Sequence, residues 1–200
     1  MMGYKVGIGV SNKHLHLSEE HLAALFGAGY ALTPYKELVQ PGQYAAEEKV
    51  DIVGPKGAIK GLRIIGPTRS QTQVELSVTD ARGMGLSPPV VESGHLSGTP
   101  GVKVIGPVGE VDLNEGVMIA LRHIHLNPRQ AEDAGLKDHD LVDVATYGGR
   151  PLIFQDVVIR AGDAHEREFH IDTDEANAAG LASGDEVEVI RKRDGIRSGS

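Results

Sequence analysis

Glycine and proline interrupt this sequence so often that long helices are not expected. The chain has 26 glycines and 10 prolines among its 200 residues, and both residue types mark turns and the ends of regular elements. Between them lie short runs rich in valine and isoleucine, such as KVDIVGP, IKGLRIIGP and TQVELSVTD in the central part. Short, frequent strands of this kind are typical of a small β-barrel.

An internal repeat occupies the C-terminal part of the chain. HLNPRQAEDAGLKDHDLVDV (125–144) aligns without gaps on HIDTDEANAAGLASGDEVEV (170–189), with eight identical positions. Each copy is predicted to contain a strand end, a polar cap, a short helix, a glycine stop and a second strand. Asn127 is expected to cap the first helix, and Gly135 and Gly180 are expected to end the two helices.

The start of the chain shows the same opening as the repeat. In HLSEEHLAALFG, a histidine and an apolar residue precede Ser18, which is expected to cap a short helix ended by Gly27. His16, His125 and His170 therefore occupy one structural position, the end of a strand just before a capped helix. A shared position of this kind favours a functional role for the three histidines over a purely structural one.

Several classes of protein are excluded or disfavoured by composition. The chain has no cysteine, which excludes disulfides, iron–sulfur clusters, cysteine-ligated zinc fingers and a cysteine nucleophile. Its formal net charge of −8 argues against a general nucleic-acid-binding protein. No apolar run approaches the roughly 18 residues that a membrane span requires, and the first residues do not resemble a signal peptide. We therefore expect a cytoplasmic protein with no membrane and no nucleic-acid partner.

Two His-x-His pairs occur, in SNKHLHLS and LRHIHLN. Residues i and i+2 of a strand face the same way, so His14 with His16, and His123 with His125, would each present two imidazoles together. Neutral imidazoles placed in this way suit a divalent cation. With His170 included, five histidines exceed the tetrahedral demand of one zinc ion, which indicates two metals. The other histidines are expected at the surface: His21, His95, His139 and His165.

The stretch GPTRSQTQVELSVTD contains two further candidates. Glu75 lies between Val74 and Leu76, so its carboxylate could simply occupy the solvent face of a half-buried strand. Near a pair of imidazoles, the same carboxylate would be a third metal ligand. The planar, permanently charged guanidinium of Arg69 suits a phosphate or another oxyanion. The sequence alone does not decide whether Glu75 and Arg69 have these functional roles or are ordinary surface residues.

VSNKHLHLS, RSQTQVELS, LRHIHLNP and FHIDTDEANAAG, in this order, resemble the PduL-type phosphate acyltransferases (phosphate propanoyltransferases) from about Val6 to Val189. The resemblance implies a mainly β fold of two small β-barrels capped by short α-helices. The first barrel is expected to combine residues 3–12 with 121–190, and the second to comprise 34–93. Residues 94–120 are then expected to form a connector, and 191–200 a disordered tail.

The resemblance also implies a reaction: reversible transfer of a short acyl group, propanoyl or acetyl, between coenzyme A and inorganic phosphate. It implies a site with two Zn²⁺ ions, although such ligands also accept other divalent metals. His14, His16 and Glu75 would hold the zinc that takes the sulfur of coenzyme A. The second zinc would be held by His123, His125 and His170.

The resemblance also implies which residues would bind phosphate and coenzyme A. Arg69 would bind the phosphate, which would attack the acyl carbon directly, since there is no cysteine to form an acyl-enzyme. Contacts with coenzyme A would come from Val10, Ser11, Asn12, Lys56, Arg63 and Asn177.

The location and assembly of the chain are also matters of expectation. About five residues precede the first predicted strand, so the N-terminal extension that directs some family members into microcompartments is not seen. This favours a free, cytoplasmic form and leaves acetyl-CoA as plausible a substrate as propanoyl-CoA. A homodimer is possible, because pairing would cover exposed strand edges.

Two other functions compete with this interpretation. A zinc-dependent hydrolase or thioesterase would use zinc-bound hydroxide, although no His-x-His-x-Asp-His run is present. A non-enzymatic binding module is the other alternative, since AGLASGDEVEV resembles hairpins of small barrels that bind partners. Cleavage without phosphate would favour the hydrolase, whereas histidines that bind no metal would favour the binding module.

Overall fold

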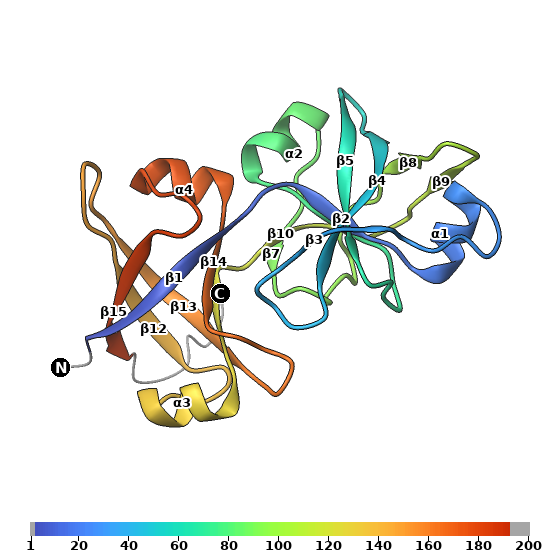
Figure 1. The fold of residues 1–200 in the computed structure, drawn as a ribbon. Helices are drawn as coiled ribbons and strands as arrows, with labels where there is room; N and C mark the ends of the chain where they lie inside the picture. The colour runs from blue at the N-terminus through green and yellow to red at the C-terminus, as the bar shows by residue number, and fades with distance from the viewer. Residues whose placement is uncertain (1–2, 193–200) are drawn as a thin grey trace. The chain divides into compact units, whose positions relative to one another are not determined.

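The computed structural model describes residues 3–192 and divides the chain into two compact units (Figure 1). Of the described residues, 3–11 and 122–192 form the first unit, and 12–121 form the second. Among the described residues there are 15 strands and four short helices, so the mainly β class is confirmed. The first unit contains β1 (Tyr4–Ser11), β11 (His123–Leu126), α3 (Pro128–Ala134), β12 (Leu141–Ala145), β13 (Ile153–Ala161), β14 (Glu168–Asp172), α4 (Thr173–Ala179) and β15 (Glu186–Lys192).

The strands of the first unit close into a barrel in the order β1-β14-β11-β13-β12-β15. β1 pairs in parallel with β14 and antiparallel with β15. The pairing of β1 with β15, the first and last strands of this unit, closes the barrel. Alternate side chains fill the interior, including Ile8, Ile124 and Phe169, which are almost completely buried. Figure 1 shows α4 at one end of this barrel and α3 at the other.

The internal repeat corresponds to the units β11–α3–β12 and β14–α4–β15. Asn127 accepts a hydrogen bond from the backbone N–H of Gln130, in a complete capping box. Asp172 caps α4 in the same way. Gly135 (φ 65°) and Gly180 (φ 67°) end the helices in the left-handed region that favours glycine. The predicted caps and glycine stops are therefore confirmed.

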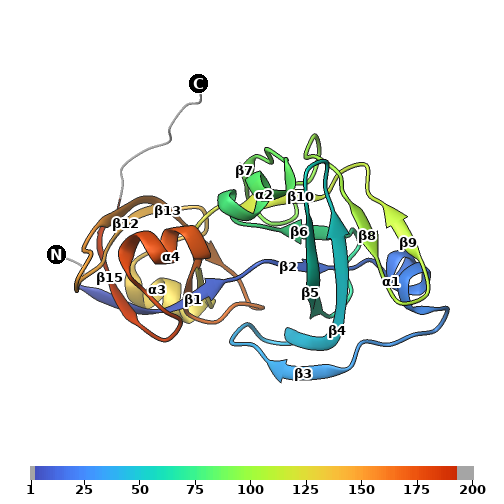
Figure 2. The same ribbon diagram turned by 90° about the horizontal axis from the view of Figure 1, so that it is seen from above.

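The second unit is built on a half-barrel sheet of nine strands. Their order is β7-β10-β6-β2-β5-β4-β8-β9, and β3 pairs with the first residues of β4. Ser18 caps α1, as predicted, and Figure 2 shows this helix beside β9. The elements are β2 (His14–His16), α1 (Glu19–Phe26), β3 (Pro34–Glu37), β4 (Tyr44–Val53), β5 (Ala58–Gly66), β6 (Gln73–Glu75), α2 (Val78–Met84), β7 (Val90–Val91), β8 (Lys103–Ile105), β9 (Glu110–Asp112) and β10 (Val117–Ala120).

Residues 94–120, expected to be a connector, supply β8, β9 and β10 to this sheet. Val104 and Val117 from these strands are fully buried in the core of the second unit. Strands of three or four residues between glycines and prolines give too short a hydrophobic pattern to be distinguished from a loop. Of the tail expected at 191–200, residues 191 and 192 belong to β15, and 193–200 lie outside the described residues.

Within residues 3–192, no helix is both long enough and apolar enough to cross a membrane.

Candidate metal centres

The second unit brings His14, His16 and Glu75 together on one face of its sheet. β2 and β6 are antiparallel, and their register places His14 opposite Glu75. The intervening Leu15 and Val74 point to the other face and are fully buried in the core. His14 Nε2 lies 3.6 Å from Glu75 Oε2, and His16 Nε2 lies 3.9 Å from Glu75 Oε1. We call these three residues the His–His–Glu group.

The imidazoles of this group are oriented by backbone carbonyl groups. Nδ1 of His14 lies 2.8 Å from the carbonyl oxygen of Asn12, and Nδ1 of His16 lies 3.0 Å from that of Ile65. Because a carbonyl oxygen can only accept a hydrogen bond, Nδ1 must carry the proton in each ring. The lone pair of the neutral ring is then on Nε2. Metal-binding histidines are commonly held by a hydrogen bond of this type.

Burial and mutual interaction set the charges in the His–His–Glu group. Burial, with the neighbouring His14 and Arg69, lowers the pKa of His16 to about 3, so this imidazole is neutral at physiological pH. Burial also acts to lower the pKa of His14, but the Glu75 carboxylate outweighs it and the pKa is raised. Burial acts to raise the pKa of Glu75, but His14, His16 and Arg69 hold it well below its ordinary value. The group thus combines an ionised carboxylate with two imidazoles, a donor set suited to Zn²⁺.

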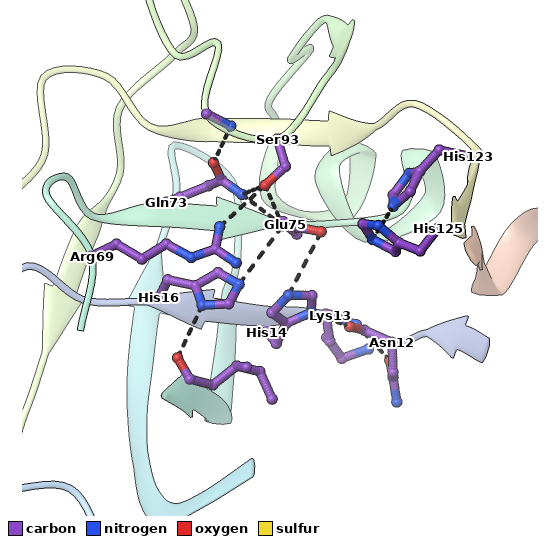
Figure 3. Close-up of polar contacts among 12 residues, drawn as sticks. Asn12, Lys13, His14, His16, Arg69, Gln73, Glu75, Ser93, His123 and His125 are labelled. Carbon is purple, nitrogen blue, oxygen red and sulfur yellow. Dashed lines mark hydrogen bonds and ion pairs between the residues drawn. The ribbon is translucent and has the colours of Figure 1, made fainter. Parts of the chain in front are cut away.

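A hydrogen-bond network joins Glu75 to three polar side chains (Figure 3). Gln73 Nε2 donates to Glu75 Oε1 at 2.6 Å and to Ser93 Oγ at 2.7 Å, while the backbone N–H of Gly94 donates to Gln73 Oε1. Ser93 Oγ also accepts a hydrogen bond from Arg69 Nη1 at 3.1 Å. The guanidinium of Arg69 is therefore fixed beside the His–His–Glu group.

Arg69 also lines a cavity of about 930 Å³ within the second unit. Its other walls include Ser18, Ser70 and Thr72 and four acidic residues, Glu19, Glu20, Asp112 and Glu115. The backbone N–H of Arg69 donates to the carbonyl of Leu17 at 2.8 Å, which fixes the start of the side chain.

The first unit brings together the second predicted set, His123, His125 and His170, which we call the three-histidine group. β11 and β14 are antiparallel, with His123 opposite His170. Nε2 of His123 lies 3.0 Å from Nε2 of His125 (Figure 3). The ring of His170 has its centroid 5.1 Å from that of His123 and 4.8 Å from that of His125.

The three-histidine group has the properties of a cation site. Burial, with His123 and His170 nearby, holds the pKa of His125 far below its ordinary value. Two buried ring nitrogens 3.0 Å apart need a proton or a cation between them. In each unit the candidate ligand atoms all lie within 4.8 Å of one another. Both groups therefore fit a divalent metal ion.

His165 lies nearer to this group than the sequence predicts. Its ring centroid is 4.2 Å from that of His125, in a tilted stack. Nδ1 of His165 and Nδ1 of His125 are both buried without a hydrogen-bond partner. The prediction of a surface histidine was wrong in this respect, because the turn of Gly162 to His165 folds back over the end of β11.

The predicted coenzyme A contacts are distributed over both units. Val10 and Ser11 lie at the end of β1, and Asn177 is exposed on α4. In the second unit, Asn12 precedes β2 and binds His14 through its carbonyl oxygen. Lys56 is exposed in the loop before β5, and Arg63, within β5, donates to the carbonyl of Ala46 at 2.6 Å.

Sequence reasoning missed three polar residues that contact the predicted ligands: Gln73, Ser93 and Glu168. Ser93 lies in a loop 18 residues after Glu75, and no local pattern relates the two. Gln73 and Glu168 each precede a predicted ligand by two residues, so they share its face of the strand. That spacing was the available signal for both.

Comparison with known proteins identifies the family. A family model described as phosphate propanoyltransferase matches residues 7–182. A phosphate propanoyltransferase of Thermotoga maritima is 58% identical over 184 residues, covering 92% of this chain and 88% of the relative. The phosphate propanoyltransferase of Clostridioides difficile is 47% identical over 187 residues, covering 94% and 90%. That of Sebaldella termitidis is 49% identical over 184 residues, covering 91% and 86%.

These matches span nearly the whole chain, including every member of both metal groups. They support an enzyme that transfers acyl groups, and they give no support to a non-enzymatic binding module. The resemblance noted from the four sequence motifs is confirmed: the chain belongs to the phosphate propanoyltransferase family.

Proposed function

We propose that this chain catalyses the reversible transfer of a short acyl group, propanoyl or acetyl, between coenzyme A and inorganic phosphate. The observation that carries the proposal is the position of Arg69 beside the His–His–Glu group, where Ser93 fixes its guanidinium. An anion-binding side chain next to a candidate metal site is what a reaction between phosphate and a thioester requires. The names of the relatives, phosphate propanoyltransferase, support the same reaction.

The two metal groups are proposed to hold Zn²⁺. His14, His16 and Glu75 would provide one set of ligands, and His123, His125 and His170 the other. Bound zinc would supply Lewis acidity for the thioester carbonyl and phosphate, and an open coordination position for the sulfur of coenzyme A.

Arg69 is proposed to bind phosphate from the cavity that it lines. A guanidinium presents N–H donors in a plane that matches two phosphate oxygens, and its charge offsets the repulsion among them. Because Ser93 and the backbone hydrogen bond to Leu17 fix Arg69, a phosphate oxygen is held in place before it reacts. Holding the nucleophile in this way lowers the entropic cost of the reaction.

The proposed reaction is a direct attack. A phosphate oxygen forms a bond to the acyl carbon, the carbon–sulfur bond breaks, and its electron pair leaves with the sulfur of coenzyme A. The proton of hydrogen phosphate balances the thiolate, so the products are an acyl phosphate and free coenzyme A. The chain has no cysteine, which is consistent with a route that has no acyl-cysteine intermediate.

Six residues are proposed to contact coenzyme A. Lys56, in the loop before β5, and Arg63, within β5, would provide positive charge for its phosphate groups. Ser11, Asn12 and Asn177 would contribute polar side chains, and Val10 its backbone.

The test is release of free thiol from propanoyl-CoA and acetyl-CoA, with and without phosphate, before and after chelation. Phosphate-dependent release that a chelator abolishes would support the proposal, and the ratio of the two rates would give the acyl preference. Release that proceeds equally without phosphate would instead indicate a metal-dependent thioesterase. No release from either substrate would refute the proposed function.

A further inference from the structure

Gln73 contacts both parts of the proposed site in the second unit, Glu75 directly and Arg69 through Ser93. The residue is only 1% exposed. Its amide N–H groups donate to Glu75 Oε1 at 2.6 Å and to Ser93 Oγ at 2.7 Å (Figure 3). The amide oxygen accepts the backbone N–H of Gly94 at 2.8 Å. Both N–H groups and the oxygen of the amide therefore have partners.

These contacts fix the direction in which the amide of Gln73 faces. In the reverse orientation, its oxygen would face the carboxylate of Glu75, and its N–H groups would face the backbone N–H of Gly94. Both contacts would be repulsive, and at a buried position water cannot replace the lost hydrogen bonds. The donor side of the amide is therefore directed at Glu75 and Ser93.

A tight turn holds Ser93 and Gly94 against Gln73. The backbone N–H of His95 donates to the carbonyl of Glu92 at 3.0 Å, which closes a four-residue turn. Gly94 has φ 96°, whereas Ser93 before it does not have a positive φ. This combination is typical of a type II turn, in which the third residue favours glycine. The turn thus brings a side-chain hydroxyl and a backbone N–H to the same amide.

The hydroxyl of Ser93 continues the connection to Arg69. Its oxygen accepts hydrogen bonds from Gln73 and from Arg69 Nη1, the latter at 3.1 Å. Its own O–H points to Glu75 Oε1 at 3.5 Å. One buried amide and one hydroxyl therefore link a candidate metal ligand to the proposed phosphate-binding side chain.

We propose that Gln73 is a positioning residue of the reaction, which holds Glu75 in place for the metal ion and, through Ser93, holds Arg69 in place for phosphate. The inference rests on the proposed function, since it assumes both of these ligands. A hydrogen bond to an ionised carboxylate is strong and directional, so it restricts the rotation of a carboxylate ligand. Loss of such a partner commonly lowers metal affinity or activity ten- to hundredfold.

The first measurement is the Zn²⁺ affinity of the His–His–Glu group, by competition with a chromogenic chelator. All chains in this assay carry His125→Ala and His170→Ala, so that only the His–His–Glu group binds zinc, and thermal unfolding confirms that each one folds. Gln73→Met keeps the length of the side chain without the amide, and should bind zinc ten- to hundredfold more weakly than this background. Ser93→Ala should bind zinc within threefold of it, because the bond from Gln73 to Glu75 remains.

The second measurement is thiol release at saturating Zn²⁺, with each substitution made in the otherwise unaltered chain. Gln73→Met and Ser93→Ala should each raise the KM for phosphate about tenfold, since each loosens the guanidinium of Arg69. Ser93→Thr keeps the hydroxyl and should have a KM within threefold of the wild type. A residue that only stabilised the fold would lower the unfolding temperature on substitution and change neither the zinc affinity nor the KM.

Two glycines provide a matched pair of substitutions. Gly94→Ala strains the turn at φ 96° and should displace the N–H that fixes Gln73, so that zinc affinity falls and the KM for phosphate rises. Gly42, at φ 74°, occupies the same position in a turn that the N–H of Gln43 closes onto the carbonyl of Gln40. Neither glycine has an atom within 4 Å of an added Cβ, so both substitutions introduce strain without a clash. Gly42→Ala should leave both quantities within threefold of the control.

A zinc affinity or a KM for phosphate that stays within threefold of the control in Gln73→Met would overturn the role of Gln73. Equal losses in Gly42→Ala and Gly94→Ala would also overturn it, because strain in any turn would then account for the effect. A wild type that releases no thiol would instead refute the proposed function, and the zinc measurement would still decide whether Gln73 positions Glu75. A background chain that binds no zinc would refute both.

Discussion

Replacing Arg69 by alanine tests the proposed phosphate site most directly. A hydrogen bond to a charged group contributes about 1.5–3 kcal/mol, so a guanidinium that binds phosphate through two such bonds contributes about 3–6 kcal/mol. At about 1.4 kcal/mol for each factor of ten, Arg69→Ala should lower kcat/KM for phosphate roughly 10²- to 10⁴-fold. Arg69→Lys keeps the charge without the planar pair of donors, so its loss should be smaller.

The same substitution should leave the zinc content unchanged. Arg69 donates a hydrogen bond to Ser93, and its positive charge contributes to lowering the pKa of His16 and of Glu75. Removing a positive charge does not weaken the attraction of this group for a cation. The assay is thiol release at varied phosphate concentration, with zinc measured on the same preparations. Arg82→Ala, on the exposed part of α2, is the control for loss of an arginine elsewhere in the unit.

If Arg69→Ala kept the wild-type kcat/KM for phosphate and still bound zinc, the proposal that Arg69 binds phosphate would be refuted. A variant that lost both activity and zinc would also contradict the reasoning, because Arg69 would then be needed for the metal group itself.

Three further outcomes follow from the structure. Asn127→Ala removes the capping box of α3 and should lower the free energy of unfolding by about 1 kcal/mol in urea titrations; a change below about 0.3 kcal/mol would contradict the role of the cap. Phe169→Ala empties a fully buried position in the first barrel and should cost about 3–5 kcal/mol in the same assay. Burial acts to raise the pKa of Glu48, but hydrogen bonds from Thr33 and Tyr30 hold it below its ordinary value of 4.5. Glu48 therefore stabilises the fold above pH 4.5 and loses this contribution as the pH falls further, so Glu48→Gln should show a weaker loss of stability in acid than the wild type.

The local features of the fold could be predicted because they depend on neighbouring residues. A polar cap and a glycine stop act within one turn of a helix, so Ser18, Asn127 and Gly135 marked helix ends correctly. The His-x-His pairs were equally local, since strand alternation alone places both imidazoles on one side. Predicting which residues form the His–His–Glu group also requires the register of two strands. This register, which places Glu75 opposite His14, is a non-local property.

Strand pairing could not be predicted from the same patterns. β1 and β2 are separated only by Asn12 and Lys13, yet β1 joins the barrel of the first unit and β2 the sheet of the second. A break between two units at this point has no proline or glycine to mark it. Ser93 was missed for the related reason that its contacts with Arg69 and Gln73 depend on the path of a loop.

The helix caps also explain why the ligands lie where they do. A strand that leads into a capped helix ends with a buried apolar residue immediately before the cap. Because side chains alternate, the residue before that apolar one points away from the core, at the end of the strand. The sequence predicts this position for three histidines. The helix α2 with its cap Ser77 adds a fourth case, in which Glu75 precedes the buried Leu76. Four of the six candidate ligands therefore follow from one strand-to-helix connection used four times: His16, Glu75, His125 and His170.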